Sequence, residues 1–124
     1  MAKILVVDDS GLSRQMSGRI LRESGHDVVE AQDGIAALET YFLEKPEVVF
    51  LDINMKGMNG FDVLAKLREL DPHACIVIAT ADIQSSTRKM AAEGGARGFV
   101  TKPFVAAEVA RAVNAALEGC KEWI

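Results

Sequence analysis

The chain lacks the features that mark several large classes of protein. None of its apolar runs approaches the ~18 residues needed to cross a bilayer, and too few apolar residues precede Asp8 for a signal peptide. Basic residues are in the minority, with 14 Lys and Arg against 18 Asp and Glu and a net charge of −4. That balance argues against nonspecific binding to DNA, RNA or acidic membranes. We therefore expect a cytoplasmic protein without nucleic-acid binding or membrane insertion.

Cysteine is also scarce. The two cysteines, Cys75 and Cys120, do not belong to a CxxC pair, so we expect neither a cysteine metal site nor a disulfide. Cys75 stands inside an apolar run, which is typical of a small core residue. No linker, low-complexity tract or block of like charges divides the sequence. A length of 124 residues, 49% of them hydrophobic, suits one domain over residues 1–124.

What the chain does contain is a regular alternation of short apolar runs and segments with helical spacing. The expected strands are Ile4–Val7, Val28–Ala31, Val48–Leu51, Cys75–Ala79 and Gly98–Thr101. Apolar residues at helical spacing predict helices over 12–21, 35–43, 61–70, 83–93 and 105–117. Such alternation predicts an α/β fold, in which helices cover both faces of a parallel sheet.

The composition of the strands predicts their order. Strands one, three and four are apolar throughout, as strands buried on both faces must be, whereas strands two and five are shorter or more polar and belong at the edges. The order 2-1-3-4-5 fits this pattern. We therefore expect a flavodoxin-like, doubly wound (βα)5 fold. Its ligands bind at the carboxyl ends of the strands, where the chain reverses direction between strands one and three.

Four of the five expected strands end on, or are followed by, a charged or hydroxyl residue. In chain order these residues are Asp8 with Asp9, Asp52, Thr80 and Lys102. Two carboxylates about 5 Å apart repel by roughly 3 kcal/mol at an effective dielectric constant near 20, so three of them need a cation. Because all the donors are oxygens, Mg²⁺ is favoured and Mn²⁺ can substitute.

The same residues suit phosphoryl chemistry. Lys102 can neutralise an incoming phosphoryl group, and Thr80 can hydrogen-bond one of its oxygens. Asp52 is the candidate nucleophile, because it stands between the acidic pair and Thr80 in strand order. Each residue also has a simpler alternative role. Asp8 or Asp9 can cap the first helix, Asp52 and Thr80 can be turn residues, and Lys102 can be a solvated surface lysine. One shared site explains all the positions at once, whereas the simpler roles require separate coincidences.

Along its whole length the sequence resembles the CheY-like receiver domain of bacterial two-component response regulators. The resemblance rests on the motifs VVDDS, AQDG, LDINM followed by MNG, ATAD, and KPF. It implies that Asp52 accepts a phosphoryl group from a sensor histidine kinase or phosphotransfer protein. It also implies that Asp9, Asp52 and the backbone carbonyl of Asn54 contact Mg²⁺ directly, and that Asp8 holds the ion through water.

The resemblance further implies how the signal is read and ended. Lys102 would pair with the phosphoryl group or the carboxylate, and its bond to Pro103 would be cis. Thr80 and Phe99 would form the switch that reshapes the surface of helix four, strand five and helix five for a downstream partner not yet identified. Asn54 and Asp82 would tune self-dephosphorylation. The resemblance therefore implies a signalling switch rather than a general enzyme, and chemotaxis is one pathway in which it could act.

Three positions depart from the usual family pattern. Lys56 replaces a common proline, Phe99 replaces a tyrosine found in many members that bind flagellar motors, and Asn59 replaces a common aspartate. Since the sequence ends shortly after the fifth helix, we expect a stand-alone receiver.

Three other readings compete with a phosphorylated receiver. A phosphatase of the haloacid dehalogenase type needs an aspartate at the position of Asn54, and its acidic pair follows the nucleophile instead of preceding it. A flavodoxin needs a phosphate loop after strand one, where this chain has the acidic sequence DDSG. A degenerate receiver would lack acceptor-site residues, all of which are present.

Overall fold

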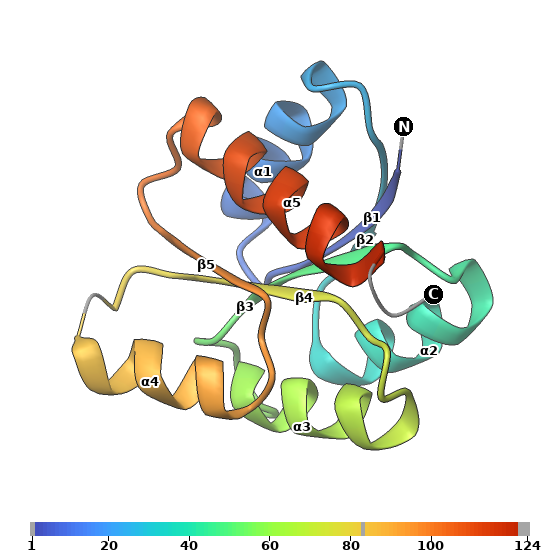
Figure 1. The fold of residues 1–124 in the computed structure, drawn as a ribbon, viewed down its shortest axis with the longest axis vertical. Coiled ribbons are helices and arrows are strands. Elements are labelled where there is room, and N and C mark those ends of the chain that lie inside the picture. Colours follow the sequence, from blue (N-terminus) through green and yellow to red (C-terminus); the bar gives the residue numbers. More distant parts are fainter. Residues whose placement is uncertain (1, 83, 122–124) are drawn as a thin grey trace.

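The apolar runs form the strands of a parallel sheet, and the segments between them form helices (Figure 1). The computed structural model describes residues 2–82 and 84–121, without the side chains of 120 and 121. Over these residues the element order is β1 (Lys3–Val7), α1 (Gly11–Glu23), β2 (Asp27–Ala31), α2 (Gly34–Glu44), β3 (Val48–Asp52), α3 (Gly60–Leu70), β4 (Ile76–Thr80), α4 (Ser85–Glu93), β5 (Gly98–Thr101) and α5 (Ala106–Lys121). The helix start expected at Ile83 lies outside the described residues.

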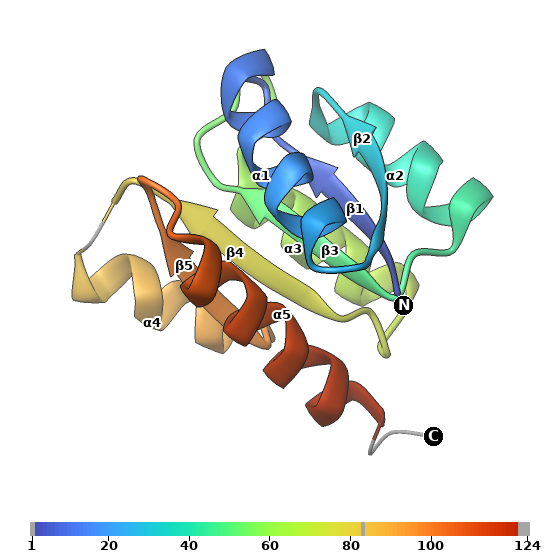
Figure 2. The same cartoon turned by 90° about the horizontal axis from the view of Figure 1, so that it is seen from above.

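The sheet has the predicted order, β2-β1-β3-β4-β5, and all four strand pairs are parallel. Helices α1 and α5 cover one face, and α2, α3 and α4 cover the other (Figure 2). Because side chains alternate along a strand, β1 sends Ile4 and Val6 into the core under α1 and α5, and Leu5 and Val7 into the opposite core. The flavodoxin-like fold class is confirmed.

Several of the large apolar residues that marked the first two helices face solvent. Leu12 of α1 is 70% exposed and Leu43 of α2 is 80% exposed. The buried residues of these helices are Ser17, Gly18 and Leu21 in α1 and Gly34, Ala37 and Tyr41 in α2. The apolar spacing therefore predicted both helices and the burial of Leu21 correctly, but not the exposure of Leu12 and Leu43.

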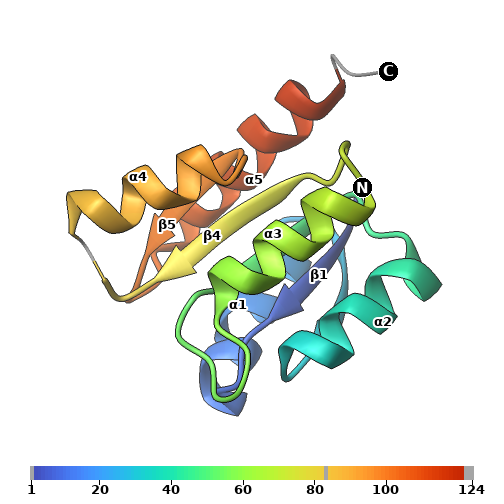
Figure 3. The same ribbon diagram turned by 90° about the horizontal axis from the view of Figure 1, so that it is seen from below.

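The parallel arrangement gives the molecule two different poles. The carboxyl ends of the strands face one pole, and the amino ends face the other. The start of β1 and the end of α5 both lie at the amino pole (Figure 3). No helix among the described residues is long and apolar enough to cross a membrane.

The expectation that disulfide chemistry is absent is wrong. Cys75 takes part in a disulfide bond, and its sulfur lies 3.4 Å from the carbonyl oxygen of Ala116 in α5. The other cysteine of the sequence, Cys120, has a side chain outside those described. A disulfide depends on closeness in space rather than on spacing along the chain, so the lack of a CxxC pair could not exclude one.

Candidate functional site

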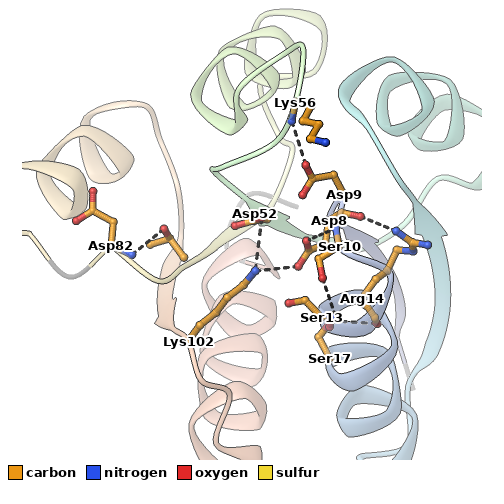
Figure 4. Close-up of polar contacts among 11 residues, drawn as sticks. Asp8, Asp9, Ser10, Ser13, Arg14, Ser17, Asp52, Lys56, Asp82 and Lys102 are labelled. Atoms are coloured by element: carbon orange, nitrogen blue, oxygen red, sulfur yellow. Dashed lines mark hydrogen bonds and ion pairs between the residues drawn. The ribbon is translucent and has the colours of Figure 1, made fainter.

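Three carboxylates meet at the carboxyl end of the sheet (Figure 4). Asp8 and Asp9 follow β1, and Asp52 is the last residue of β3. Because Val7 and Leu51 are paired in the sheet, the residues that follow them are neighbours. One oxygen from each carboxylate lies within 4.8 Å of the others. Asp8 and Asp52 are only 3% and 4% exposed, whereas Asp9 faces solvent.

Lys102 brings an ammonium group to the two buried carboxylates. Its Nζ lies 3.1 Å from Asp8 Oδ2 and 3.5 Å from Asp52 Oδ2. The backbone N–H of Lys102 donates to the carbonyl oxygen of Thr80 over 2.8 Å. This bond holds the backbone of Lys102 beside the end of β4. The Lys102–Pro103 peptide bond is cis. Among the described residues this ammonium is the ionic partner of Asp8 and of Asp52.

Burial and like charge make the ionised form of Asp52 costly. Burial raises its pKa to about 6, and the nearby charge of Asp8 contributes in the same direction. The Lys102 ammonium and a hydrogen bond from the backbone N–H of Asn54 partly oppose this rise in pKa. The site therefore keeps an excess of negative charge, since one lysine faces three carboxylates. Hard oxygen donors so close together fit a divalent cation such as Mg²⁺.

Asp8 is held in place by residues that the sequence did not point to. The backbone N–H of Ser10 donates to Asp8 Oδ1 over 3.0 Å. The Arg14 guanidinium donates to the backbone carbonyl of Asp8 over 2.7 Å and forms a 3.0 Å ion pair with Glu30 on β2. The α1 helix is capped by the Ser10 hydroxyl, which accepts from the N–H of Ser13. Capping is therefore not the role of Asp8 or Asp9.

The exposed carboxylate of Asp9 is tied to the loop that follows β3. Its Oδ2 accepts a 3.1 Å hydrogen bond from the backbone N–H of Lys56. The proline that the resemblance led us to expect at this position has no N–H and could not make this bond. The side chain of Lys56 lies beside Asp9 on the solvent side (Figure 4). Asn54 is exposed on the same loop.

Gly60 lets α3 start directly against the backbone of the candidate nucleophile. Its N–H donates to the carbonyl oxygen of Ile53 over 2.7 Å. A Cβ at this position would lie 2.4 Å from both the Asp52 carbonyl oxygen and the Ile53 Cα. Both neighbours are backbone atoms, which cannot move aside as a flexible side chain can. The close approach therefore requires glycine.

Thr80 is connected to α4 through a series of hydrogen bonds. Its fully buried hydroxyl accepts from the backbone N–H of Asp82 over 3.1 Å. The Asp82 carboxylate in turn accepts from the Thr87 hydroxyl over 2.6 Å and from the backbone N–H of Gln84 over 2.9 Å. These two bonds, that of Thr87 first, lower the pKa of Asp82. Sequence spacing gave no indication of Thr87, because its role depends on the turn before α4.

The predicted residues therefore fall into two groups. Asp8, Asp9, Asp52 and Lys102 meet directly, and Thr80 adjoins them because Asp52 pairs with Ala79 in the sheet. Asp82 contacts Thr80 rather than the carboxylates. Phe99 is half-buried in β5 and packs on the core beneath α4. The guanidinium of Arg88 lies 4.8 Å from the centre of its ring.

Known proteins resemble this chain in sequence and in structure. The family model described as the response regulator receiver domain matches residues 4–114. The chemotaxis protein CheY of Thermotoga maritima is 36% identical over 113 residues, which cover 90% of this chain and 94% of that protein. The chemotaxis protein CheY of Bacillus subtilis is 38% identical over 116 residues, covering 93% and 97%.

A solved structure gives the same picture. The chemotaxis protein CheY4 of Vibrio cholerae superposes with a TM-score of 0.88 at 30% identity, covering 94% of this chain and 98% of that one. The residues matched by the family model, 4–114, include Asp8, Asp9, Asp52 and Lys102. The chain therefore belongs to the receiver domain family of response regulators.

Proposed function

We propose that the chain is a phosphorylation-activated switch in which Asp52 accepts a phosphoryl group from a sensor histidine kinase or a phosphotransfer protein. The observation that carries the proposal is the position of Asp52. It is buried at the end of β3, in contact with the Lys102 ammonium and beside Asp8 and Asp9. A carboxylate that is buried beside an ammonium group is fixed in position and poorly solvated, and both properties favour its use as a nucleophile.

Magnesium is the cofactor that these donors fit. Asp8, Asp9, Asp52 and the backbone carbonyl of Asn54 would hold Mg²⁺, and Mn²⁺ would substitute. When bound, the ion supplies positive charge that lets an anionic phosphoryl group approach three carboxylates. The excess negative charge at the site supports this assignment, as does the solvent-facing carboxylate of Asp9.

The phosphotransfer step uses residues at fixed positions. An Asp52 carboxylate oxygen attacks phosphorus, the P–N bond of the phosphohistidine breaks, and the electron pair of that bond stays on the imidazole nitrogen. The Lys102 ammonium lies 3.5 Å from Asp52 Oδ2, so it neutralises charge that develops on the phosphoryl oxygens. Thr80, at the end of the neighbouring strand, donates its hydroxyl to a phosphoryl oxygen.

Phosphorylation changes one surface of the protein, and hydrolysis of the acyl phosphate restores the original state. Movement of Thr80 towards the phosphoryl group breaks its hydrogen bond with Asp82, and Phe99 repacks behind it. This reshapes the surface of α4, β5 and α5 that a downstream protein contacts. Water then hydrolyses the acyl phosphate, and Asn54 and Asp82 border its approach and set the lifetime. The activity is that of a signalling switch, not of a general phosphatase.

Similar proteins support a particular signalling pathway for this switch. Two of the similar proteins are chemotaxis proteins of bacteria, so chemotaxis-type signalling in the cytoplasm is the pathway we propose. A phosphotransfer screen against purified kinases of the host would identify the kinase that donates to Asp52.

Intact mass after incubation with Mg²⁺ and a small acyl-phosphate donor tests the acceptor. The wild-type protein should gain one alkali-labile phosphate, and Asp52→Asn should gain none. Asp62→Asn, which changes an exposed aspartate in the first turn of α3, serves as the matched control and should be labelled like wild type. A chelator should abolish labelling. Equal labelling of Asp52→Asn and wild type would overturn the assignment.

A further inference from the structure

The side chain of Arg14 runs from the start of α1 back to the end of β1, beside the candidate site. Its Nη1 donates to the backbone carbonyl oxygen of Asp8 over 2.7 Å (Figure 4). Its Nε forms a 3.0 Å ion pair with Oε1 of Glu30 on β2, and only 20% of the side chain is exposed. A planar guanidinium that donates in two directions is fixed in one orientation. Arg14 therefore links the strand end that carries Asp8 to the neighbouring strand.

The carbonyl that Arg14 holds belongs to the peptide between the two acidic residues that follow β1. The pairing of β1 with β2 ends at Val7 and Ala31, so this carbonyl lies beyond the last paired residues. The Asp8 N–H still donates to the Ala31 carbonyl, over 3.2 Å, and Arg14 holds the other side of the residue. Because a peptide unit is planar, fixing its oxygen also fixes the direction in which the chain enters Asp9. One side chain of α1 thus helps to hold the backbone that carries both carboxylates.

Glu30 binds the Arg14 guanidinium with a carboxylate that lies outside the candidate site. Its Oε1 pairs with Arg14, and its Oε2 pairs over 3.2 Å with Nη2 of Arg22, from the last turn of α1. An arginine without this partner would be free to form an ion pair with Asp8 or Asp9, and it would then occupy the oxygens that a metal ion needs. Glu30 therefore satisfies the charge of Arg14 and leaves its Nη1 for the backbone carbonyl.

We propose that Arg14, held by Glu30, is a positioning residue of the metal site. It fixes the peptide between Asp8 and Asp9, so that both carboxylates face a divalent cation without rearrangement. The cation is the Mg²⁺ of the proposed function, and the inference rests on that function to this extent. Charge and position predict opposite results for this residue. Loss of the positive charge of Arg14 alone would tighten Mg²⁺ binding, whereas loss of its positioning contacts weakens binding.

Calorimetric titration of the protein with Mg²⁺ separates these two effects by their sign. Arg14→Met keeps the apolar stem and removes every donor, and it should weaken Mg²⁺ binding about tenfold. Arg14→Lys keeps the charge but has no planar fork to reach both partners, so it should weaken binding by only about threefold. If Arg14→Met does not fold, the lysine variant carries the same test. Tighter or unchanged Mg²⁺ binding in both variants would overturn the proposal.

A double-mutant cycle tests whether Glu30 acts through Arg14. Glu30→Met alone should weaken Mg²⁺ binding about threefold, and it should have no further effect in the Arg14→Met background, because the group that it holds is then gone. Additive losses would overturn the role assigned to Glu30. Arg19→Met is the matched control, since Arg19 also lies on α1 but its side chain is 81% exposed in an ion pair with Glu23. This control should bind Mg²⁺ as wild type does, or slightly more tightly.

Amide hydrogen exchange, measured by NMR with a chelator present, tests the positioning role without any metal. The N–H of Ser10 donates to Asp8 Oδ1, and the N–H of Lys56 donates to Asp9 Oδ2, so each amide reports the place of one carboxylate. Arg14→Met should make both amides exchange several-fold faster, while the amides of β3 stay as slow as in wild type and the control variant changes neither. Unchanged exchange at both amides would overturn the proposal. Faster exchange, in a protein whose wild type bound no Mg²⁺, would support the positioning role and count against the metal of the proposed function.

Discussion

Replacing Asp52 with asparagine should make the metal-free protein more stable at neutral pH. The wild-type carboxylate is 4% exposed and shares a single ammonium with Asp8, which lies closer to that ammonium, at 3.1 Å against 3.5 Å. Asparagine removes one negative charge and leaves the shorter pair of Lys102 with Asp8 in place. The substitution therefore relieves repulsion and loses little attraction.

The size of the gain follows from the pKa of Asp52. That pKa rises from 3.8 to about 6 on folding, and each pKa unit corresponds to about 1.4 kcal/mol. Ionised Asp52 therefore costs the folded state about 3 kcal/mol at neutral pH. Asparagine is itself polar and buried, and it gives up the ionic contact at 3.5 Å. The net gain expected is thus about 1–2 kcal/mol.

The pH dependence of the gain gives the sharper test. Above about pH 6, Asp52 is ionised in both states, and the folded state carries the full cost. As the pH falls from about 6 to 3.8, the folded protein takes up a proton before the unfolded chain does, so the cost disappears. The advantage of Asp52→Asn should therefore be complete near pH 8 and nearly absent near pH 4.

Urea unfolding with a chelator present, at several pH values, measures this difference. Asp27→Asn, at an exposed position of β2, is the matched control and should not reproduce the pattern. Addition of Mg²⁺ should reduce the advantage of Asp52→Asn, because only wild type keeps all three carboxylates. A gain that stayed constant between pH 4 and pH 8, or no gain at neutral pH, would refute the reasoning.

Three further substitutions test individual contacts. Gly60→Ala places a Cβ 2.4 Å from the backbone of Asp52 and Ile53, so it should destabilise the fold by about 3 kcal/mol in urea unfolding, and a loss below about 1 kcal/mol would contradict that contact. Thr87→Val removes the hydroxyl that donates to Asp82; in an NMR titration the pKa of Asp82 should move back up towards its ordinary value, while Thr87→Ser should leave it low. Lys56→Gln should tighten Mg²⁺ binding a few-fold at most at low ionic strength. Calorimetry at two salt concentrations should show that last gain fading as salt is added, and a gain that persisted would point to loop geometry instead of charge.

The sequence was sufficient for the sheet and for the centre of the site. Apolar runs such as ILVV and VVFL are strong signals, and the polar residues that follow them must meet, because parallel strands end at the same edge. This is why Asp8, Asp52 and Lys102 could be placed together although Lys102 lies 94 residues beyond Asp8. Local pattern and topology together determine such positions.

Contacts that depend on helix orientation or on turn geometry could not be predicted in the same way. The bonds from Arg14 to Asp8 and from Thr87 to Asp82 follow from how α1 and α4 begin, which apolar spacing does not specify. The exposure of Leu12 and Leu43 has a related cause, since apolar spacing does not specify which of a helix's apolar residues face the sheet. The disulfide at Cys75 depends on spatial proximity alone.

The separation of the two poles has a practical consequence for single-molecule and surface-based measurements. Lys3 and Glu44 are joined by a 3.1 Å ion pair at the amino pole, and the exposed Lys45 follows directly after α2. A dye, a resin or a force handle coupled there stands about 16 Å, one strand length, from the carboxylates of the candidate site. The protein can therefore be immobilised through this pole while the approach of a phosphoryl donor stays open.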